Sequence, residues 1–285
     1  MYQDYSFDFN RLQFFSQIGE GPFSDVYIAK DKVSGSFFAA KIFRQKFGEE
    51  NAQKKANEDI LNEINSFSKL KHPLVSNFIG FNFTDFQRKK NPVIIREFIS
   101  KGTLNEFIQS FEKQVYCSEF KDTLKLIILY GISLSMAFLH SNSIIHSHLN
   151  PNNIFIDEKY NPIITDFYFS KFTHQNTKSL ITAAKNDKNS ILYLAPECFS
   201  ESHYTQKSDV YSFALIAYKI MSNKDPLCEL NYQEIIEKVR NGIRPEFDFQ
   251  VSDSYRHLIE KCWSQDPSKR PTFDQISIQL KTDNG

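Results

Sequence analysis

The sequence lacks net charge, a pairing pattern of cysteines and any low-complexity segment. Its 285 residues balance 34 Lys and Arg against 34 Asp and Glu, so no overall field favours nucleic acid or an anionic membrane. The four cysteines show no CxxC spacing, and we find no secretory signal at the N-terminus. We therefore expect reduced thiols and a cytoplasmic location. No internal repeat is visible, which argues against a solenoid.

The sequence also has no long uninterrupted hydrophobic run. Its most apolar stretch, from Thr123 to His140, is interrupted by Lys125, which predicts a buried helix rather than a membrane span. Hydrophobic residues nevertheless make up 41% of the chain and include 28 Phe. This content supplies a sizeable core for one large domain or for two lobes. We expect neither nucleic acid nor a membrane as a partner.

Two patterns divide the chain. Five strand-like runs rich in aromatic and β-branched residues come first, at Arg11–Ile18, Val26–Lys30, Ser36–Phe43, Leu74–Phe83 and Pro92–Ile99. Apolar residues at helical spacing predict one helix among them, over 52–70, and then helices over 104–113, 122–141, 208–221, 231–241, 253–264 and 272–281. This order predicts an α+β, two-lobed fold, in which a small five-stranded antiparallel lobe with one helix precedes a larger helical lobe.

The segment IGEGPFSDV at 18–26 places two glycines between strand-like runs. Alone this pattern is weak, because a plain hairpin turn explains it at least as well. Its context adds to it, since Lys41 lies at the end of the third run and Glu63 lies in the following helical segment. Glycines let a backbone approach phosphates, and a lysine held by a glutamate supplies a point charge. Alternatively, both charged residues are solvated.

Further motifs follow in the second part of the chain. They are HSHLNPNN at 146–153, ITDFY at 164–168, APE at 195–197, SDVYSF at 208–213 and CWSQDPSKRP at 262–271. With these motifs and the glycine segment, the chain resembles a eukaryotic protein kinase domain over about residues 14–281. The last two motifs are similar to those of the tyrosine-kinase-like group, and the loop at 146–153 follows the Ser/Thr kinase order.

The resemblance implies a single kinase domain over 14–285, with an N-lobe over 14–99 and a C-lobe over 100–285. It also implies that ATP and Mg²⁺ are bound. Asn153 and Asp166 would hold the metal, since amide and carboxylate oxygens suit a hard cation. The residues implied to contact the nucleotide are Ile18, Gly19, Gly21, Val26, Ala39, Lys41, Glu63, Glu97, Ile99 and Phe155.

Some implied roles concern the shape of the pocket and the scaffold. Arg96 falls at the gatekeeper position of the hinge strand, where it either extends through the back of the pocket or narrows it. Phe155 would stack on adenine or fill its space. Glu197 is expected to pair with Arg270, and Asp209 to hold the backbone of the catalytic loop.

Two positions remove catalytic groups from the family pattern. His148 stands in place of the Asp that accepts the substrate proton, and Asn150 in place of the Lys that contacts the γ-phosphate. Histidine is a competent general base, but a neutral imidazole lacks the negative charge that orients the hydroxyl. The loose transition state of phosphoryl transfer leaves room for some activity without a base.

Two further positions change the loops around this site. Ser147 replaces the Arg that receives a phosphate on the activation segment, and Tyr168 replaces a flexible glycine. Without that Arg, a phosphate on the activation segment lacks its docking partner. The hydroxyls to which this applies are Thr173, Thr177, Thr182 and Ser190.

Three hypotheses follow from these departures. The favoured one is a pseudokinase that binds ATP and Mg²⁺ and signals through its conformation and an unidentified protein partner. The second is an active protein Ser/Thr kinase that uses His148 or no base at all and acts on an unidentified protein substrate. The third is a nucleotide-free interaction module in which Pro22, Arg96 and Phe155 close the pocket.

Overall fold

The chain is described from a computed structural model. The structure describes residues 7–21, 24–44, 64, 70–111, 118–166, 171–172, 188–199 and 204–282. The chain divides into two compact units, an N-terminal unit (Met1–Ile99) and a C-terminal unit (Ser100–Gly285). Each unit is described by itself below.

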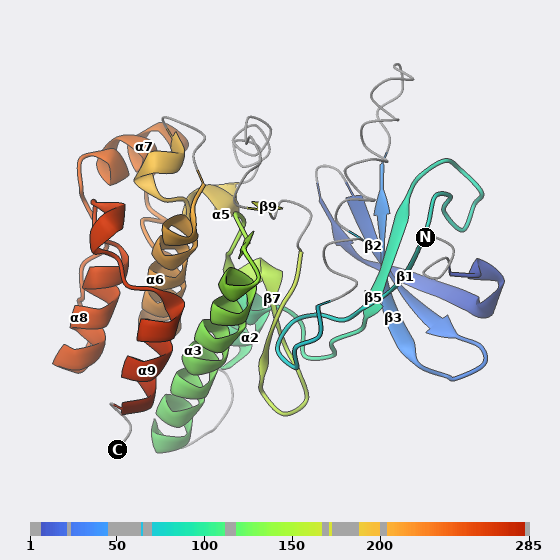
Figure 1. Cartoon of the computed structure of the whole chain (residues 1–285), viewed down its shortest axis with the longest axis horizontal. Helices are drawn as coiled ribbons and strands as arrows, with labels where there is room; N and C mark the ends of the chain where they lie inside the picture. Colours follow the sequence, from blue (N-terminus) through green and yellow to red (C-terminus); the bar gives the residue numbers. More distant parts are fainter. Residues whose placement is uncertain are drawn as a thin grey trace. The chain divides into compact units, whose positions relative to one another are not determined.

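The N-terminal unit is built on a five-stranded antiparallel sheet (Figure 1). A short 3-10 turn, η2 (Phe9–Arg11), leads into the first strand. The strands occur in the order β1-β2-β3-β5-β4. Their bounds are β1 (Leu12–Glu20), β2 (Ser24–Asp31), β3 (Phe37–Phe43), β4 (Phe78–Asn82) and β5 (Val93–Glu97).

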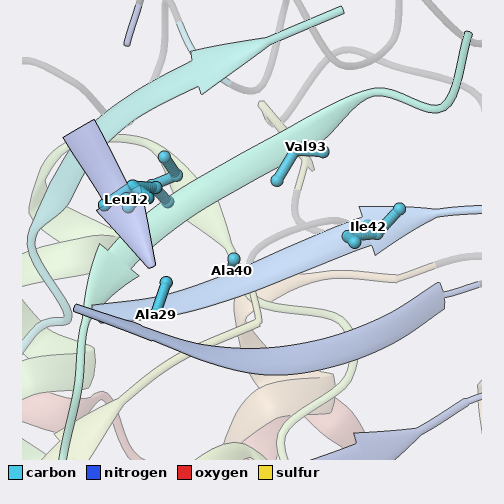
Figure 2. Packing of buried hydrophobic residues seen from close by; sticks show 6 residues of the cluster. Leu12, Ala29, Ala40, Ile42 and Val93 are labelled. Atoms are coloured by element: carbon cyan, nitrogen blue, oxygen red, sulfur yellow. The ribbon is translucent and has the colours of Figure 1, made fainter. Parts of the chain in front are cut away.

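One face of this sheet carries a hydrophobic core cluster (Figure 2). Tyr27 lies opposite Ala40 and Val26 lies opposite Lys41, so successive residues of each strand alternate between the two faces. The cluster occupies the face of Ala40, and its members are Leu12, Ala29, Ala40, Ile42, Val93 and Ile95. Partly buried aromatic residues such as Phe14 and Phe38 pack against it. Val26 and Lys41 lie on the opposite face of the sheet.

The C-terminal unit is mainly helical. Its helices are α2 (Leu104–Phe111), α3 (Ser118–Ser141), α5 (Lys188–Ile191), α6 (Gln206–Ser222), α7 (Tyr232–Arg240), α8 (Asp253–Cys262) and α9 (Phe273–Thr282). Two small antiparallel ribbons accompany them, β6 (Ile144–Ile145) with β9 (Lys171–Phe172) and β7 (Ile154–Ile156) with β8 (Pro162–Ile164). The 3-10 turns of this unit are η3 (Pro151–Asn153), η5 (Pro196–Phe199) and η6 (Pro267–Lys269).

Helix α3 lines the core of this unit. By length and composition alone it is apolar enough over Asp122–Ser141 to cross a membrane, but core helices of soluble proteins pass the same test. Leu129, Ile132 and Met136 are fully buried, and the helix packs on α9, α6 and β8. It is thus a core element of the unit, as its interrupted apolar run predicts.

Helix α6 is buried around its whole circumference from Ser208 to Ile220. It begins with a capping box, in which Thr205 accepts from the Lys207 amide and Ser208 accepts from the Thr205 amide. It ends at Asn223, which takes the left-handed conformation with φ 59° that asparagine tolerates better than most residues. A buried helix of this kind is a rigid support for the polar groups that it carries.

These elements confirm the predicted fold class. The five predicted strands and the helices predicted after residue 101 are all present, with ends that differ by a few residues. The predicted helix over 52–70 lies outside the described residues except for Ile64, which is helical and 1% exposed. The short pieces α5, β6, β7, β8 and β9 lie outside the predicted elements.

Candidate active site

Several predicted nucleotide residues share one face of the sheet. Gly19 lies opposite Val26 on β2, and Val26 in turn lies opposite Lys41 on β3. Ala39 is on the same face as Lys41, because it precedes that lysine by two residues. Arg96 lies opposite Ala39 and therefore joins this row. The structure thus brings the residues together on the face opposite the core cluster.

The glycine turn connects β1 to β2. The Gly21 amide donates to the carbonyl of Ser24 at 2.8 Å, so in this conformation that amide is used within the turn. A Cβ added at Gly19 would come no closer than 3.5 Å to Val26, and one added at Gly21 no closer than 3.5 Å to Ser24. Packing among the described residues therefore does not require either glycine, which leaves the close approach of a ligand as a reason for them. Ile18 is 45% exposed beside the turn.

Lys41 lies on the strand as predicted, with its ammonium 5.6 Å from the ring centroid of Phe43. The two residues share a face two positions apart, so the contact is a cation–π interaction along one strand. Glu63, the predicted partner of Lys41, lies outside the described residues. Its neighbour Ile64 is described, and it is helical and buried.

Glu97, one of the predicted hinge residues, is the last residue of β5. The Glu97 carboxylate accepts from the Asn77 amide at 2.9 Å and from its side-chain Nδ2 at 3.1 Å. The Glu97 amide donates to the Asn77 carbonyl at 3.3 Å. The side chain of Glu97 therefore fixes the end of the sheet, and Ile99 ends the unit two residues later.

In the C-terminal unit, Asp209 holds the base of the catalytic loop. Its Oδ2 accepts from the His146 amide at 2.8 Å and its Oδ1 from the Ser147 amide at 2.9 Å. His140 Nε2 lies 2.9 Å from the same Oδ2. Asp209 is 1% exposed, so these donors replace the water that a buried carboxylate requires. The expected role of Asp209 is confirmed.

His146 links this loop to the segment that carries Asp166. Its Nε2 lies 2.9 Å from the Thr165 carbonyl, and its Nδ1 accepts from the His148 amide at 3.3 Å. A carbonyl only accepts, so the proton is on Nε2. Burial lowers the pKa of His146, and Asp209 opposes that shift. The ring is therefore a neutral structural link rather than a charged group.

Ser147 has a strained backbone for a non-glycine residue, with φ 63°. Its hydroxyl is buried and has no hydrogen-bond partner within the described part of the chain. The hydrogen bonds from the His146 and Ser147 amides to Asp209 hold the backbone in this conformation. The side chain of Ser147 plays no part in it. The substitution of the family Arg therefore leaves the loop geometry in place.

His148 is held through both of its ring nitrogens. Nε2 lies 2.7 Å from the hydroxyl of Ser190, and Nδ1 lies 2.9 Å from Nδ2 of Asn153. The same Asn153 Nδ2 donates to the His148 carbonyl at 2.8 Å, which fixes the orientation of the amide. Nδ1 is thus the acceptor, and the proton on Nε2 points to Ser190. To accept a substrate proton, His148 must break one of these contacts.

Asn150 folds back on its own loop. Its Nδ2 donates to the His148 carbonyl at 3.1 Å, and its Oδ1 accepts from the Asn152 amide at 2.9 Å. The residue is 3% exposed and caps the turn η3. Both polar atoms are therefore used in the loop, and neither is presented to a phosphate as the ammonium of a lysine would be.

The predicted metal residues lie at the ends of the ribbon β7–β8. Ile154 pairs with Ile164, and the Thr165 amide and hydroxyl donate to the Asn153 carbonyl at 2.9 and 3.1 Å. Asp166 follows directly, in the left-handed conformation with φ 62°. Asn153 Oδ1 receives no hydrogen bond from the described residues. Asn153 and Asp166 therefore lie at the same end of the ribbon, and Asn153 provides an amide oxygen of the kind that suits Mg²⁺.

The remaining predicted positions are Phe155, Tyr168 and three threonines. Phe155 is half-buried on β7, between Ile163 of β8 and a bridge to Thr103. Tyr168 lies outside the described residues, as do Thr173, Thr177 and Thr182. Among the described residues, no group of three His, Cys, Asp or Glu side chains could hold a metal ion. An Asn and an Asp alone would leave most coordination positions to phosphates and water.

Sequence reasoning gave no role to the contact between Ser190 and His148. Ser190 was considered only as a phosphorylation target, but it is 2% exposed and bonded to His148. The two residues are 42 positions apart, so no local pattern signals their contact. The available signal was the position of Ser190 shortly before the APE motif.

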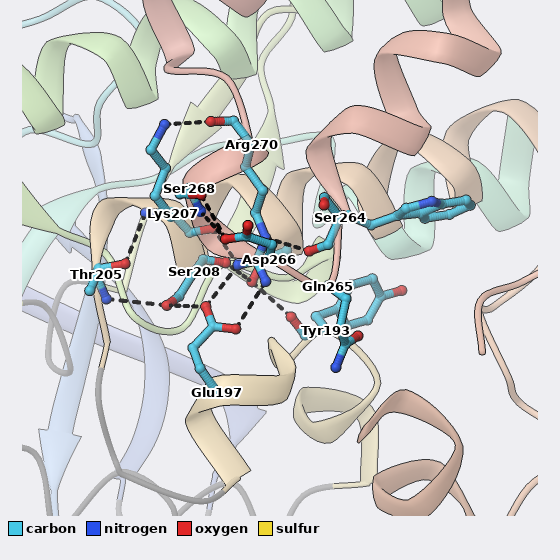
Figure 3. A network of polar contacts seen from close by, with 12 residues as sticks. Tyr193, Glu197, Thr205, Lys207, Ser208, Ser264, Gln265, Asp266, Ser268 and Arg270 are labelled. Carbon is cyan, nitrogen blue, oxygen red and sulfur yellow. Dashed lines mark hydrogen bonds and ion pairs between the residues drawn. The ribbon is translucent and has the colours of Figure 1, made fainter. Parts of the chain in front are cut away.

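The scaffold below this region contains a buried ion pair (Figure 3). Arg270 binds Glu197 with both ends of its guanidinium, at 2.7 and 2.9 Å. It also donates to the carbonyls of Lys207 and Ser264, and Ser208 donates to Glu197 at 3.0 Å. Arg270 is 1% exposed, and a charge that is paired and hydrogen-bonded in this way is tolerated in a core. The expected pair is confirmed.

Comparison with known proteins identifies the class. The family model "protein tyrosine and serine/threonine kinase" matches residues 12–280. The chain therefore belongs to the protein tyrosine and serine/threonine kinase family, and its fold is the two-lobed α+β protein kinase fold. Members of this family generally use ATP and Mg²⁺ and act on proteins.

Individual relatives of this chain are named as kinases. A probable serine/threonine-protein kinase, gdt2 of Dictyostelium discoideum, is 29% identical over 96% of this chain and 16% of its own length. A putative serine/threonine-protein kinase/receptor, R818 of Acanthamoeba polyphaga mimivirus, is 30% identical over 98% of this chain and 16% of its own length. The serine/threonine/tyrosine-protein kinase HT1 of Arabidopsis thaliana is 28% identical over 98% of this chain and 68% of its own length. The chain thus spans about a sixth of the first two relatives.

Proposed function

We propose that this kinase domain is a pseudokinase that binds ATP and Mg²⁺ but transfers phosphate weakly or not at all. The observation that carries the proposal is the bonding of His148. Its acceptor nitrogen takes a hydrogen bond from Asn153, and its donor nitrogen points to Ser190. A general base needs a lone pair aimed at the proton that it removes. His148 has no such lone pair in this arrangement.

The neighbouring substitution supports the same conclusion. In this family ATP supplies the γ-phosphoryl group, and positive charge from metal and lysine stabilises it during transfer. Asn150 is neutral, and it caps its own turn. The loop therefore lacks both the negative charge that orients a hydroxyl and the positive charge that meets the phosphate.

Each unit nevertheless keeps its share of the nucleotide residues. In the N-terminal unit, Lys41 and Val26 lie in one row with Gly19, and packing does not require the glycines. In the C-terminal unit, Asn153 and Asp166 lie at the same end of the ribbon β7–β8, and contacts with His148 orient the Asn153 amide. These residues would hold the phosphates and the cation, while His148 acts as a support for a metal ligand.

Thermal-shift titrations with ATP test the binding half. We expect ATP to raise the Tm at millimolar concentration when Mg²⁺ is present, and to raise it less in EDTA. Asp166→Ala and Asn153→Ala should remove the difference between Mg²⁺ and EDTA, while exposed Asp274→Ala should keep it. An unchanged Tm of the parent protein with ATP contradicts nucleotide binding and favours a nucleotide-free module, in which Arg96 beside Ala39 would occupy the pocket.

Radiolabel transfer from ATP to a generic substrate tests the catalytic half. We expect incorporation near the level of an Asp166→Ala variant. Transfer well above that level would support the second candidate, an active Ser/Thr kinase. The relatives favour this candidate, since two of those compared above are named as serine/threonine kinases and the third as a serine/threonine/tyrosine kinase.

A further inference from the structure

Two carboxylates face each other at the root of the glycine turn. Glu20, the last residue of β1, lies directly opposite Asp25 on β2. Like charges in directly opposed positions of an antiparallel pair are destabilising. They are also badly placed for a phosphate ligand of the same turn, since they would repel it. The turn therefore requires a compensating positive charge.

Arg44 supplies that charge. Its Nη1 lies 3.5 Å from Glu20 Oε1, and its Nε lies 3.6 Å from Asp25 Oδ2. Its Nη2 donates to the carbonyl of Gly21. One guanidinium thus spans both carboxylates and the backbone of the turn. Because the Gly21 amide is bonded to Ser24, both backbone polar groups of Gly21 are fixed.

The position of this contact separates it from the predicted nucleotide face. Asp25 lies opposite Ile42 and therefore shares the face of the core cluster, whereas Lys41 lies on the other face. Arg44 approaches the turn from the face of Asp25. It therefore acts behind the turn and is distinct from a phosphate ligand of the Lys41 type.

We propose that Arg44 is a positioning residue for phosphate binding, which fixes the glycine turn and neutralises Glu20 and Asp25. The proposal rests on the proposed binding of ATP. Without Arg44, two uncompensated carboxylates remain behind the turn that would hold the phosphates, and the turn loses a hydrogen bond. The adenine and ribose are neutral, so their binding should not depend on this charge.

The test compares ATP with adenosine by isothermal titration calorimetry on the whole chain. We expect Arg44→Gln to weaken binding of Mg²⁺–ATP by about two- to fivefold, the upper part of the range for a partly exposed ion pair. Adenosine binding should change by less than about twofold. High salt should reduce the difference between the parent protein and the variant, because it screens exposed charges.

Matched variants separate charge from structure. Lys32 also belongs to the N-terminal unit, and its ammonium donates to the Asn10 carbonyl at 2.9 Å. Lys32→Gln removes one positive charge from this unit and should leave ATP binding unchanged. Adding Glu20→Gln to Arg44→Gln should restore part of the ATP affinity, since Glu20 is 71% exposed and its neutralisation costs little packing. Arg44→Lys, which keeps the charge without the fork, should lie between Arg44→Gln and the parent protein.

The outcomes distinguish the two proposals. If the parent protein binds ATP and Arg44→Gln binds it equally well, the role of Arg44 is overturned and nucleotide binding stands. An equal loss of ATP and adenosine affinity also overturns it, because a structural role alone then explains the result. A parent protein that binds no ATP overturns both.

Discussion

The catalytic loop has a base, at 146–147, and a tip, at 148–150. Both parts contain residues that differ from the family pattern, but the base keeps its hydrogen bonds to Asp209, whereas the tip loses its catalytic groups. At the base, Ser147 replaces a family Arg, yet Asp209 still receives both loop amides. At the tip, His148 and Asn150 form contacts through their side chains. Backbone hydrogen bonds tolerate a changed side chain, whereas side-chain chemistry does not. Loss of catalytic groups is therefore compatible with an intact scaffold.

The largest expected effect is at the base. Asp209→Ala leaves the His146 and Ser147 amides without acceptors in a buried site, so we expect a loss of about 3–5 kcal/mol in the free energy of unfolding. Urea denaturation measures this loss. The control is Asp274→Ala on exposed α9, which should change stability by less than about 0.5 kcal/mol. A loss below about 1 kcal/mol for Asp209→Ala would show that the base does not depend on this carboxylate.

The second effect concerns the tip. Combining His148→Asp with Asn150→Lys restores a charged proton acceptor and a phosphate contact on an intact base. We expect phosphotransfer to rise about 10- to 100-fold, a modest share of what a general base contributes. Radiolabel incorporation measures the rise, and Asp166→Ala in the double variant should abolish it. An unchanged rate would place the defect outside the tip, for example at Tyr168.

The third effect is smaller and tests whether the tip also has a structural role. Asn150→Ala removes the cap of η3 and should cost about 1 kcal/mol of stability, as other lost caps do. The matched control is Asn152→Ala, since the side chain of Asn152 makes no hydrogen bond with the described residues. Urea denaturation compares the two. Equal stabilities of Asn150→Ala and Asn152→Ala would mean that Asn150 has no structural role in the loop.

Periodicity predicted the regular elements of this chain better than it predicted the site. Helix α3 and the sheet strands are long enough to show their spacing, whereas β6 and β9 have two residues each and carry no periodic signal. Motif order predicted the Glu197–Arg270 pair across 73 residues. The contact of His148 with Ser190 could not be predicted, because it depends on side-chain positions that no motif specifies. The pairing of Lys41 with Glu63 stays a prediction.

The smallest effect is a pH dependence at the base. Burial lowers the pKa of His146 below its ordinary value of 6.5, so the folded protein binds this proton less readily than the unfolded chain. The lowered pKa of His146 therefore does not reduce the stability of the folded protein well above pH 6.5. Below that pH the loss of stability grows, because protons bind the unfolded chain more readily.

His146→Gln removes the titrating group and keeps a donor for the Thr165 carbonyl. Urea denaturation between about pH 8 and pH 5 should show the parent protein losing stability relative to this variant as the pH falls. His257→Gln, at an exposed histidine of α8, is the control for the substitution itself and is measured alongside. Parallel pH profiles for the parent protein and His146→Gln would mean that the base tolerates a charged imidazole.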